Sequence, residues 1–169
     1  SMRNRKHTEE KIVESATRLF SRHGLHGVSV RAIASDAGVN LSLISQYFGG
    51  KEPLYDYCME TLYDSLGEAV PALLSSIDRE KRPDTVIRDA IANAIQLGHS
   101  NRESVLLTMR DFVERGQMDE TRRDALLVPT IHNISVHLAP HSILDIKALN
   151  MAIFGVILLM GRFIAFSND

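Results

Sequence analysis

Residues 30–49 of the chain read VRAIASDAGVNLSLISQYFG, and this stretch decides the fold. Ser29 in front of it and Asn40 within it are favoured helix N-caps, because their side-chain oxygens accept a hydrogen bond from a free backbone N–H. Gly38 stands where a sharp turn needs a left-handed backbone, which glycine adopts at little cost. The stretch therefore predicts two short helices joined by a tight turn, with Gly49-Gly50 ending the second one.

The two predicted helices have the residues needed to pack closely on each other. Ala34 is small where the helices would cross, and the contact would be filled by apolar side chains at Ile33, Val39 and Ile44. This is the pattern of a helix-turn-helix unit, in which the second helix lies in the major groove of DNA.

The second helix has two distinct faces at about 100° per residue. Leu41, Ile44 and Phe48 fall on the buried side, whereas Ser42, Leu43 and Gln46 fall opposite, with Tyr47 on the flank. A glutamine amide can bond adenine through two hydrogen bonds, and a leucine can contact a thymine methyl group. The outward face is therefore a candidate for reading DNA bases.

Segments on either side complete a three-helix unit. Before it, Thr8 is an expected N-cap and an apolar stripe of helical period leads to a stop at Gly24. After it, Lys51 would begin the next helix, where the helix dipole disfavours a cation. A phosphate bound there would gain the ammonium and the free N–H groups; the alternative is a solvated lysine.

Residues 8–54 resemble the DNA-binding domain of the TetR family of bacterial repressors. The resemblance rests on elements at fixed spacing: Ile12-x-x-Ala16-x-x-Leu19-Phe20, Gly24, Gly27-Val28-Ser29-Val30, Ile33-Ala34-x-x-Ala37-Gly38-Val39, Tyr47-Phe48 and Lys51-Glu52-x-Leu54. It implies phosphate contacts at Ser29, Arg31, Tyr47 and Lys51 and a recognition helix over residues 41–46. The DNA-binding residues expected there are Leu41, Ser42, Leu43, Ser45 and Gln46.

The resemblance also implies a homodimer, a double-stranded DNA operator and an unidentified small-molecule effector bound by a C-terminal helical domain. Ser45 stands where the family often has a tyrosine, and Gln46 where it often has an aromatic residue or histidine. These departures leave the fold as expected but leave the operator sequence open.

Charge is divided unevenly between the two parts of the chain. The 169 residues have a net charge of −2, yet residues 1–52 carry eight Lys and Arg against five Asp and Glu. A basic N-terminal part favours a polyanionic partner. The single Cys58 excludes an internal disulfide, so a buried thiol in a reducing compartment is expected. With no apolar leader in the first residues, the expected location is the cytoplasm.

The rest of the chain also predicts helices, so the fold class is all-α. Helices are expected at about 53–77, 84–97, 102–115, 120–138 and 143–166, with a kink or end at Pro71 and breaks at Gly98, Gly116 and Pro140. The charged residues 78–83 predict a turn. We expect two domains: residues 1–52 for DNA binding, and residues 53–169 for effector binding and dimerisation.

The apolar run from Met151 to Phe166 is shorter than the roughly 20 residues that cross a bilayer. A helix that is apolar on nearly all sides must otherwise be buried. We therefore expect no membrane contact and burial partly by a second copy of the chain. The predicted dimer interface comprises Leu149, Ile153, Val156, Ile157 and Met160.

A possible ligand pocket is formed by Met59, Leu62, Leu106, Met109, Phe112 and Val113. Apolar residues at helical spacing are more often plain core, and that alternative stays open. The charged pairs Arg110/Glu114 and Asp111/Arg115 are expected to be solvated, with a ligand anchor as the less favoured reading.

Other classes of function find little support. His23/His26, His132/His137 and His137/His141 lack metal-site spacing, so neither a metal nor a cofactor is expected. There is no Gly-rich phosphate loop or nucleophile elbow, so no enzyme is predicted. A helical interaction module without DNA binding remains an alternative.

Overall fold

The computed structural model describes residues 2–75, 82–115 and 120–166, and the regular structure in these ranges is entirely helical. The elements are α1 (Met2–His23), α2 (Val30–Ala37), α3 (Leu41–Phe48), α4 (Lys51–Ser75), α5 (Pro83–Ser100), α6 (Arg102–Arg115), α7 (Glu120–Arg122), the π-helical segment η1 (Arg123–Leu127), α8 (Val128–Leu138), the 3₁₀ segment η2 (Ala139–His141) and α9 (Ile146–Phe166). The expected all-α fold is confirmed.

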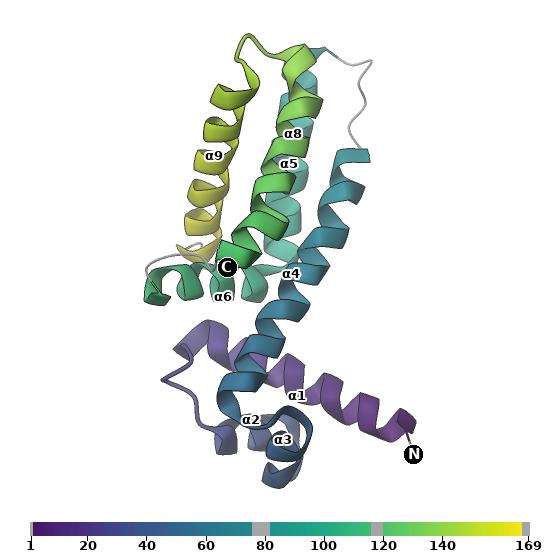
Figure 1. The fold of residues 1–169 in the computed structure, drawn as a ribbon, viewed down its shortest axis with the longest axis vertical. Coiled ribbons are helices and arrows are strands. Elements are labelled where there is room, and N and C mark those ends of the chain that lie inside the picture. The colour runs from purple at the N-terminus through teal and green to yellow at the C-terminus, as the bar shows by residue number, and fades with distance from the viewer. Residues whose placement is uncertain (1, 76–81, 116–119, 167–169) are drawn as a thin grey trace.

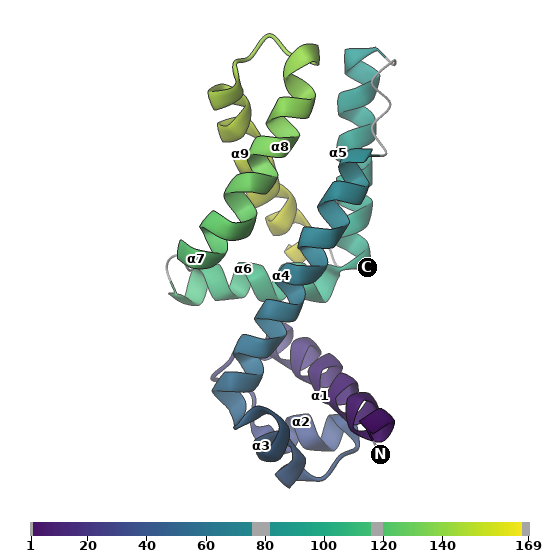
Figure 2. The same ribbon diagram turned by 45° about the vertical axis from the view of Figure 1, so that its right-hand side comes forward.

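The helices form a small head and a larger body (Figure 1). Helices α1, α2 and α3 lie together at one end, and α4 runs from them into the body, where α5, α8 and α9 extend along the long axis. Helix α6 lies across the boundary, between α1 and the body helices (Figure 2). Head and body are thus joined through α4 and α6.

The turn between α2 and α3 has the predicted local structure. Ser29 Oγ accepts a hydrogen bond from the Ala32 N–H at 3.1 Å, and Asn40 Oδ1 accepts one from the Ser42 N–H at 3.0 Å. Gly38 has a left-handed backbone with φ of 66°. The N-caps and the glycine turn predicted from the sequence are confirmed.

A single apolar core holds the head together. Ile12, Phe20, Ile33 and Ile44 are completely buried, and they belong to one cluster with Leu54, Tyr55, Cys58 and Met59 of α4. The packing therefore continues past residue 52, where the domain boundary was expected. The division into residues 1–52 and 53–169 remains a proposal.

Helices α1 and α5 have bounds that differ from those expected. Helix α1 begins at Met2 instead of Thr8, whose hydroxyl donates to the Asn4 carbonyl within the helix. The ion pair between Arg5 and Glu9, four residues apart, favours this extra length. Helix α5 continues to Ser100, whereas a break was expected at Gly98. Helix α4 contains Pro71 in its interior, so it does not end there. Gly116 and residues 78–81 of the expected turn lie outside the described residues.

An ion pair between α1 and α2 makes stability depend on pH. The Ser15 hydroxyl and the Arg18 guanidinium both bond the Asp36 carboxylate and hold its pKa below the ordinary value of 3.8. A lowered folded-state pKa contributes stability above pH 3.8 that is lost as the pH falls through the folded value.

We expect Asp36→Asn to lower the melting temperature at neutral pH, because the carboxylate contacts are lost. The difference from the wild-type protein should shrink as the pH falls below 3.8. Thermal unfolding followed by circular dichroism across this range measures it, with Asp64→Asn on the exposed surface of α4 as the control. A difference that is independent of pH would contradict the assignment.

Candidate nucleic-acid interface

Helix α3 presents a polar surface to solvent. Ser42, Ser45 and Gln46 are exposed, whereas Ile44 on the opposite side is completely buried in the head core. The sequence placed these three side chains on the outward side or in the recognition helix, and the structure brings them together on one accessible face. Hydroxyl and amide groups there can donate to or accept from base edges.

The two leucines of α3 lie differently from the predicted positions. Leu41, expected on the buried side, is 42% exposed, because it is the first residue of the helix and no earlier turn lies against it. Leu43, expected to face outward, is half-buried and packs against the head core. Of the two, Leu41 is therefore the more accessible apolar side chain for contact with DNA.

The predicted phosphate-binding residues come from three successive helices of the chain. Arg31 is exposed in the first turn of α2, and Ser29, which caps that helix, is exposed as well. Tyr47 is half-buried near the end of α3. Lys51 lies at the start of α4 and its Nζ donates to the Val28 carbonyl at 3.2 Å. These four groups thus come from the N-cap and first turn of α2, from α3 and from α4, and both α2 and α4 contact α3.

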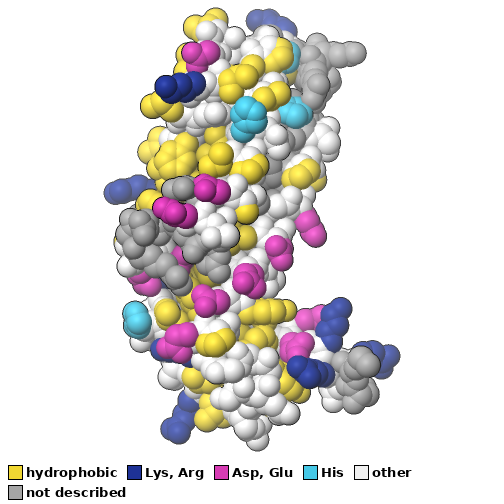
Figure 3. Space-filling model, viewed as in Figure 1, with side chains coloured by type: hydrophobic (Ala, Val, Ile, Leu, Met, Phe, Trp, Pro, Cys, Tyr) yellow, Lys and Arg dark blue, Asp and Glu magenta, His cyan; other side chains and the backbone are white. Residues whose placement is uncertain are grey.

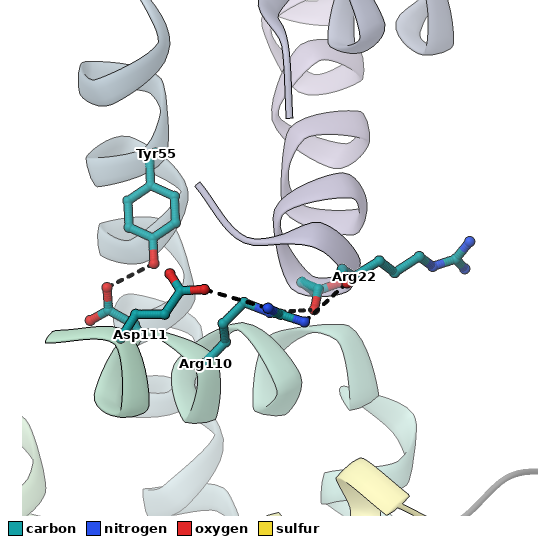
Figure 4. Close-up of polar contacts among 6 residues, drawn as sticks. Arg22, Tyr55, Arg110 and Asp111 are labelled. Carbon is teal, nitrogen blue, oxygen red and sulfur yellow. Dashed lines mark hydrogen bonds and ion pairs between the residues drawn. The ribbon is translucent and has the colours of Figure 1, made fainter. Parts of the chain in front are cut away.

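Helix α6 is bonded to the head by polar contacts that the sequence did not predict (Figure 4). Arg110 donates to the carbonyls of Ser21 and Arg22, at 3.3 and 3.0 Å, at the end of α1. Asp111 is 4% exposed and accepts a hydrogen bond of 2.7 Å from the Tyr55 hydroxyl of α4. We call these contacts of Arg110, Asp111 and Tyr55 the α6 joint.

The α6 joint corrects the expectation that the charged residues of α6 are solvated. Asp111 is buried, and Arg110, besides its pair with Glu114 at 3.4 Å, bonds the backbone of α1. Gly24 lies next to the joint and has a left-handed backbone with φ of 75°. A Cβ at this position would lie 2.6 Å from Glu114 Oε1, so glycine also leaves room for that side chain. The side chain of Arg115 lies outside the described residues.

The six candidate pocket residues differ in how far they are buried. Met59 and Leu62 are buried in the head core cluster, as the core alternative holds. Leu106 and Met109 are half-buried, whereas Phe112 is 36% and Val113 is 76% exposed. Inside the body, Ser135 Oγ of α8 and Asn150 Oδ1 of α9 are buried and make no hydrogen bond to the residues that the structure describes.

The predicted interface residues of α9 lie on more than one side of the helix. Leu149 is 6% exposed and packs within the chain, and Ile153, Ile157 and Met160 are half-buried. Val156 is 41% exposed. A helix that contacts its own body on one side and a second copy on the other is apolar on both sides, so its sequence does not separate the two.

An uncovered apolar surface does exist on α8 and α9. Figure 3 shows hydrophobic side chains gathered over these two helices. The most exposed of those on α9 are Met151 (70%), Leu159 (70%) and Phe163 (61%), and Val128 and Val136 of α8 are about half exposed. We call Met151, Val156, Leu159 and Phe163 the α9 outer face.

Length and composition alone would let α9 cross a membrane. The segment Ile146–Phe163 has 18 residues with a mean hydropathy of 1.6, and 11% of it is buried inside the chain. The apolar stretch is thus longer than the run from Met151 to Phe166 suggested, because residues 146–150 belong to the same helix.

The residues that the structure describes offer neither a metal site nor a reactive thiol. No group of three or more His, Cys, Asp or Glu in these ranges could hold a metal ion. Cys58 is 1% exposed, and burial raises the pKa of its thiol to about 11. The thiol is therefore neutral and inaccessible, and acts as a small buried side chain.

The N-terminal part of the chain matches a known protein family. Residues 12–58 match the family described as bacterial regulatory proteins, tetR family. The chain is 30% identical over 104 residues to the probable HTH-type transcriptional regulator YttP of Bacillus subtilis, covering 62% of this chain and 50% of that protein. It is also 30% identical over 112 residues to the regulator BetI of Brucella anthropi, covering 66% and 56%.

Solved structures share the fold over most of the chain. The TetR family regulator PfmR of Thermus thermophilus aligns with a TM-score of 0.69 and 19% identity, covering 90% of this chain and 83% of that one. A TetR-like regulator from Rhodococcus aligns with a TM-score of 0.63 and 19% identity, covering 94% and 82%.

These relatives are named as regulators and not as enzymes, in agreement with the sequence-based expectation. The chain spans about half the length of the curated relatives it matches.

The α6 joint predicts a specific loss of stability. Tyr55→Phe removes the hydroxyl that donates to the buried Asp111, and should lower the free energy of unfolding by about 1–3 kcal/mol. Denaturant unfolding measures this loss, with Tyr57→Phe as a matched control, because Tyr57 is 47% exposed. Equal unfolding midpoints for the two variants would contradict a stabilising role for this hydrogen bond.

Proposed function

Because this chain is a member of the TetR family of bacterial regulatory proteins, we propose that it binds duplex DNA and regulates transcription. The observation that supports this best is the exposed face of Ser42, Ser45 and Gln46 on α3. An α-helix of this kind fits the major groove, and its hydroxyl and amide groups can bond base edges.

Contacts with the DNA backbone would orient this helix. Arg31 is exposed beside α3, and Lys51 lies at the N-terminus of α4, where free N–H groups and the ammonium favour a phosphate. Such contacts supply affinity without sequence preference, whereas α3 supplies the preference. The excess of basic residues in the head fits this division.

We also propose that two copies associate through the α9 outer face and the neighbouring surface of α8. Leu159 and Met151 are each 70% exposed, and a second copy would remove them from water. A two-fold dimer places two α3 helices against two half-sites about one helical turn apart, so the operator would be palindromic. A membrane is the alternative cover for α9.

In the proposed mechanism, an effector bound in the body would control DNA binding. Ser135 Oγ and Asn150 Oδ1 are buried without a hydrogen-bond partner among the described residues, and a polar ligand group could satisfy such atoms. Movement of α6 would reach the head through Arg110 and Asp111, because they bond α1 and α4. The effector releases DNA if it prefers a dimer with a different head spacing, which makes the protein a repressor.

Selection from a random duplex pool tests this proposal most directly. We expect the full chain, at near-physiological salt, to recover an inverted repeat. Recovery of a single half-site would support DNA binding but contradict binding as a two-fold dimer. Recovery of no sequence by folded protein would overturn the DNA-binding proposal and favour a helical interaction module.

The role of α3 predicts a change in preference at one base position. Gln46→Ala should reduce discrimination there by about 1–3 kcal/mol, because one bidentate base contact is lost. Binding to the selected operator and to single-base variants measures it, with Lys51→Ala as the contrast, since a lost phosphate contact weakens all duplexes alike. A uniform loss from Gln46→Ala would show that this side chain does not read a base.

The proposed dimer depends on the α9 outer face. Leu159→Arg should convert the dimer into a monomer, because an arginine in an apolar interface leaves a buried charge unpaired. Molar mass from light scattering at micromolar concentration measures this. Val113→Arg is the control, because Val113 is 76% exposed on α6, outside this face. A dimer that persists in Leu159→Arg would place the interface elsewhere.

A further inference from the structure

The first turns of α1 lie beside the recognition helix. Figures 1 and 2 both place the N-terminal end of α1 at the level of α2 and α3. The contact is specific: the guanidinium carbon of Arg5 lies 4.9 Å from the centre of the Tyr47 ring. A cation above an aromatic face at this distance is attracted by the ring. Arg5 is thereby fixed next to the C-terminal half of α3.

Arg5 retains hydrogen-bonding capacity in this position. Its Nε donates to Glu9 Oε1 at 2.8 Å, and its side chain is 60% exposed. A guanidinium has five N–H donors, and four of them belong to the two Nη groups. Neither Nη group donates a hydrogen bond to any residue that the structure describes; the bond to Glu9 comes from Nε. The planar group is therefore oriented but still able to bind an anion.

The surrounding charge also favours an anion. The first turn of α1 contains Arg3 and Arg5 and no acidic residue, although the positive end of the helix dipole disfavours cations there. Lys6 is exposed next to them. A phosphate close to this turn would be attracted by these cations and would remove their unfavourable interaction with the dipole.

We propose that Arg5 is a DNA-backbone contact, in which its Nη groups donate to a phosphate on the strand that flanks the recognition helix. The inference rests on the proposed DNA binding and adds α1 to the elements that touch DNA. Glu9 and Tyr47 act as positioning residues, since they hold the guanidinium by one hydrogen bond and one ring contact. A planar guanidinium fixed in this way can donate to two oxygens of one phosphate, which a lysine on its flexible side chain does less well.

The salt dependence of binding tests this contact. For a mixed-sequence duplex, Arg5→Gln should lower affinity and reduce the slope of log K against log salt by about 0.9, the value for one lost phosphate contact. Lys147→Gln is the matched control. It removes the same charge from an exposed position at the start of α9, at the far end of the body, and should leave the slope unchanged.

A second variant distinguishes a phosphate contact of Arg5 from a role in supporting the Tyr47 ring. If Arg5 contacts phosphate, Arg5→Lys should retain most of the slope, because the cation remains. If Arg5 only supports the Tyr47 ring, Arg5→Gln should weaken binding with the slope unchanged, and that result overturns the inference. Circular dichroism of each variant confirms that α1 is folded.

Failure of the inference is distinguishable from failure of the proposed function. A wild-type chain that binds no duplex at low salt would overturn both. A wild-type chain that binds, with a slope that falls for Lys51→Ala but not for Arg5→Gln, would overturn the inference alone.

Discussion

The hydrogen bond between the Tyr55 hydroxyl and the buried Asp111 carboxylate connects the two halves of the molecule. Tyr55 belongs to α4, whose first turns complete the apolar core of the head, and Asp111 belongs to α6, which packs against the body. Next to it, Arg110 bonds the last carbonyls of α1. With Asp111 4% exposed, loss of this bond removes a hydrogen-bond donor from a buried carboxylate, so the α6 joint resists separation of head and body.

The free energy of this connection is comparable with the coupling free energy that the proposed control of DNA binding would need. An allosteric coupling of about 1–3 kcal/mol changes an affinity by about 5–150-fold. A single buried hydrogen bond is worth a similar amount when its partner is left unsatisfied. A ligand that weakened or strengthened the contacts of α6 with α1 and α4 would therefore suffice to change operator affinity. No large rearrangement of the body is required.

The head could be predicted from sequence because its determinants are local. Gly38, Ser29 and Asn40 act within a few residues of their own positions, and they fix the turn and both helix starts. The limits of α1 were predicted less well, because the Arg5–Glu9 pair extends the helix beyond a good cap at Thr8. The side of α3 that carries Leu41 was also misjudged, since an ideal helical wheel takes no account of the missing turn before a first residue.

Contacts between distant residues carry no such local signal. Tyr55 and Asp111 are 56 positions apart, and neither residue stands in a pattern that names the other. Helix α9 presents a different difficulty, because Leu149 faces its own body while Leu159 is 70% exposed, yet both are leucines in one apolar run. Periodicity identifies an apolar side but not which chain covers it. In the proposed dimer the α9 outer face would fix how two heads are spaced, whereas the α6 joint bonds each head to its body. The contacts that are least predictable from sequence are therefore the ones that would determine how α3 is presented to DNA.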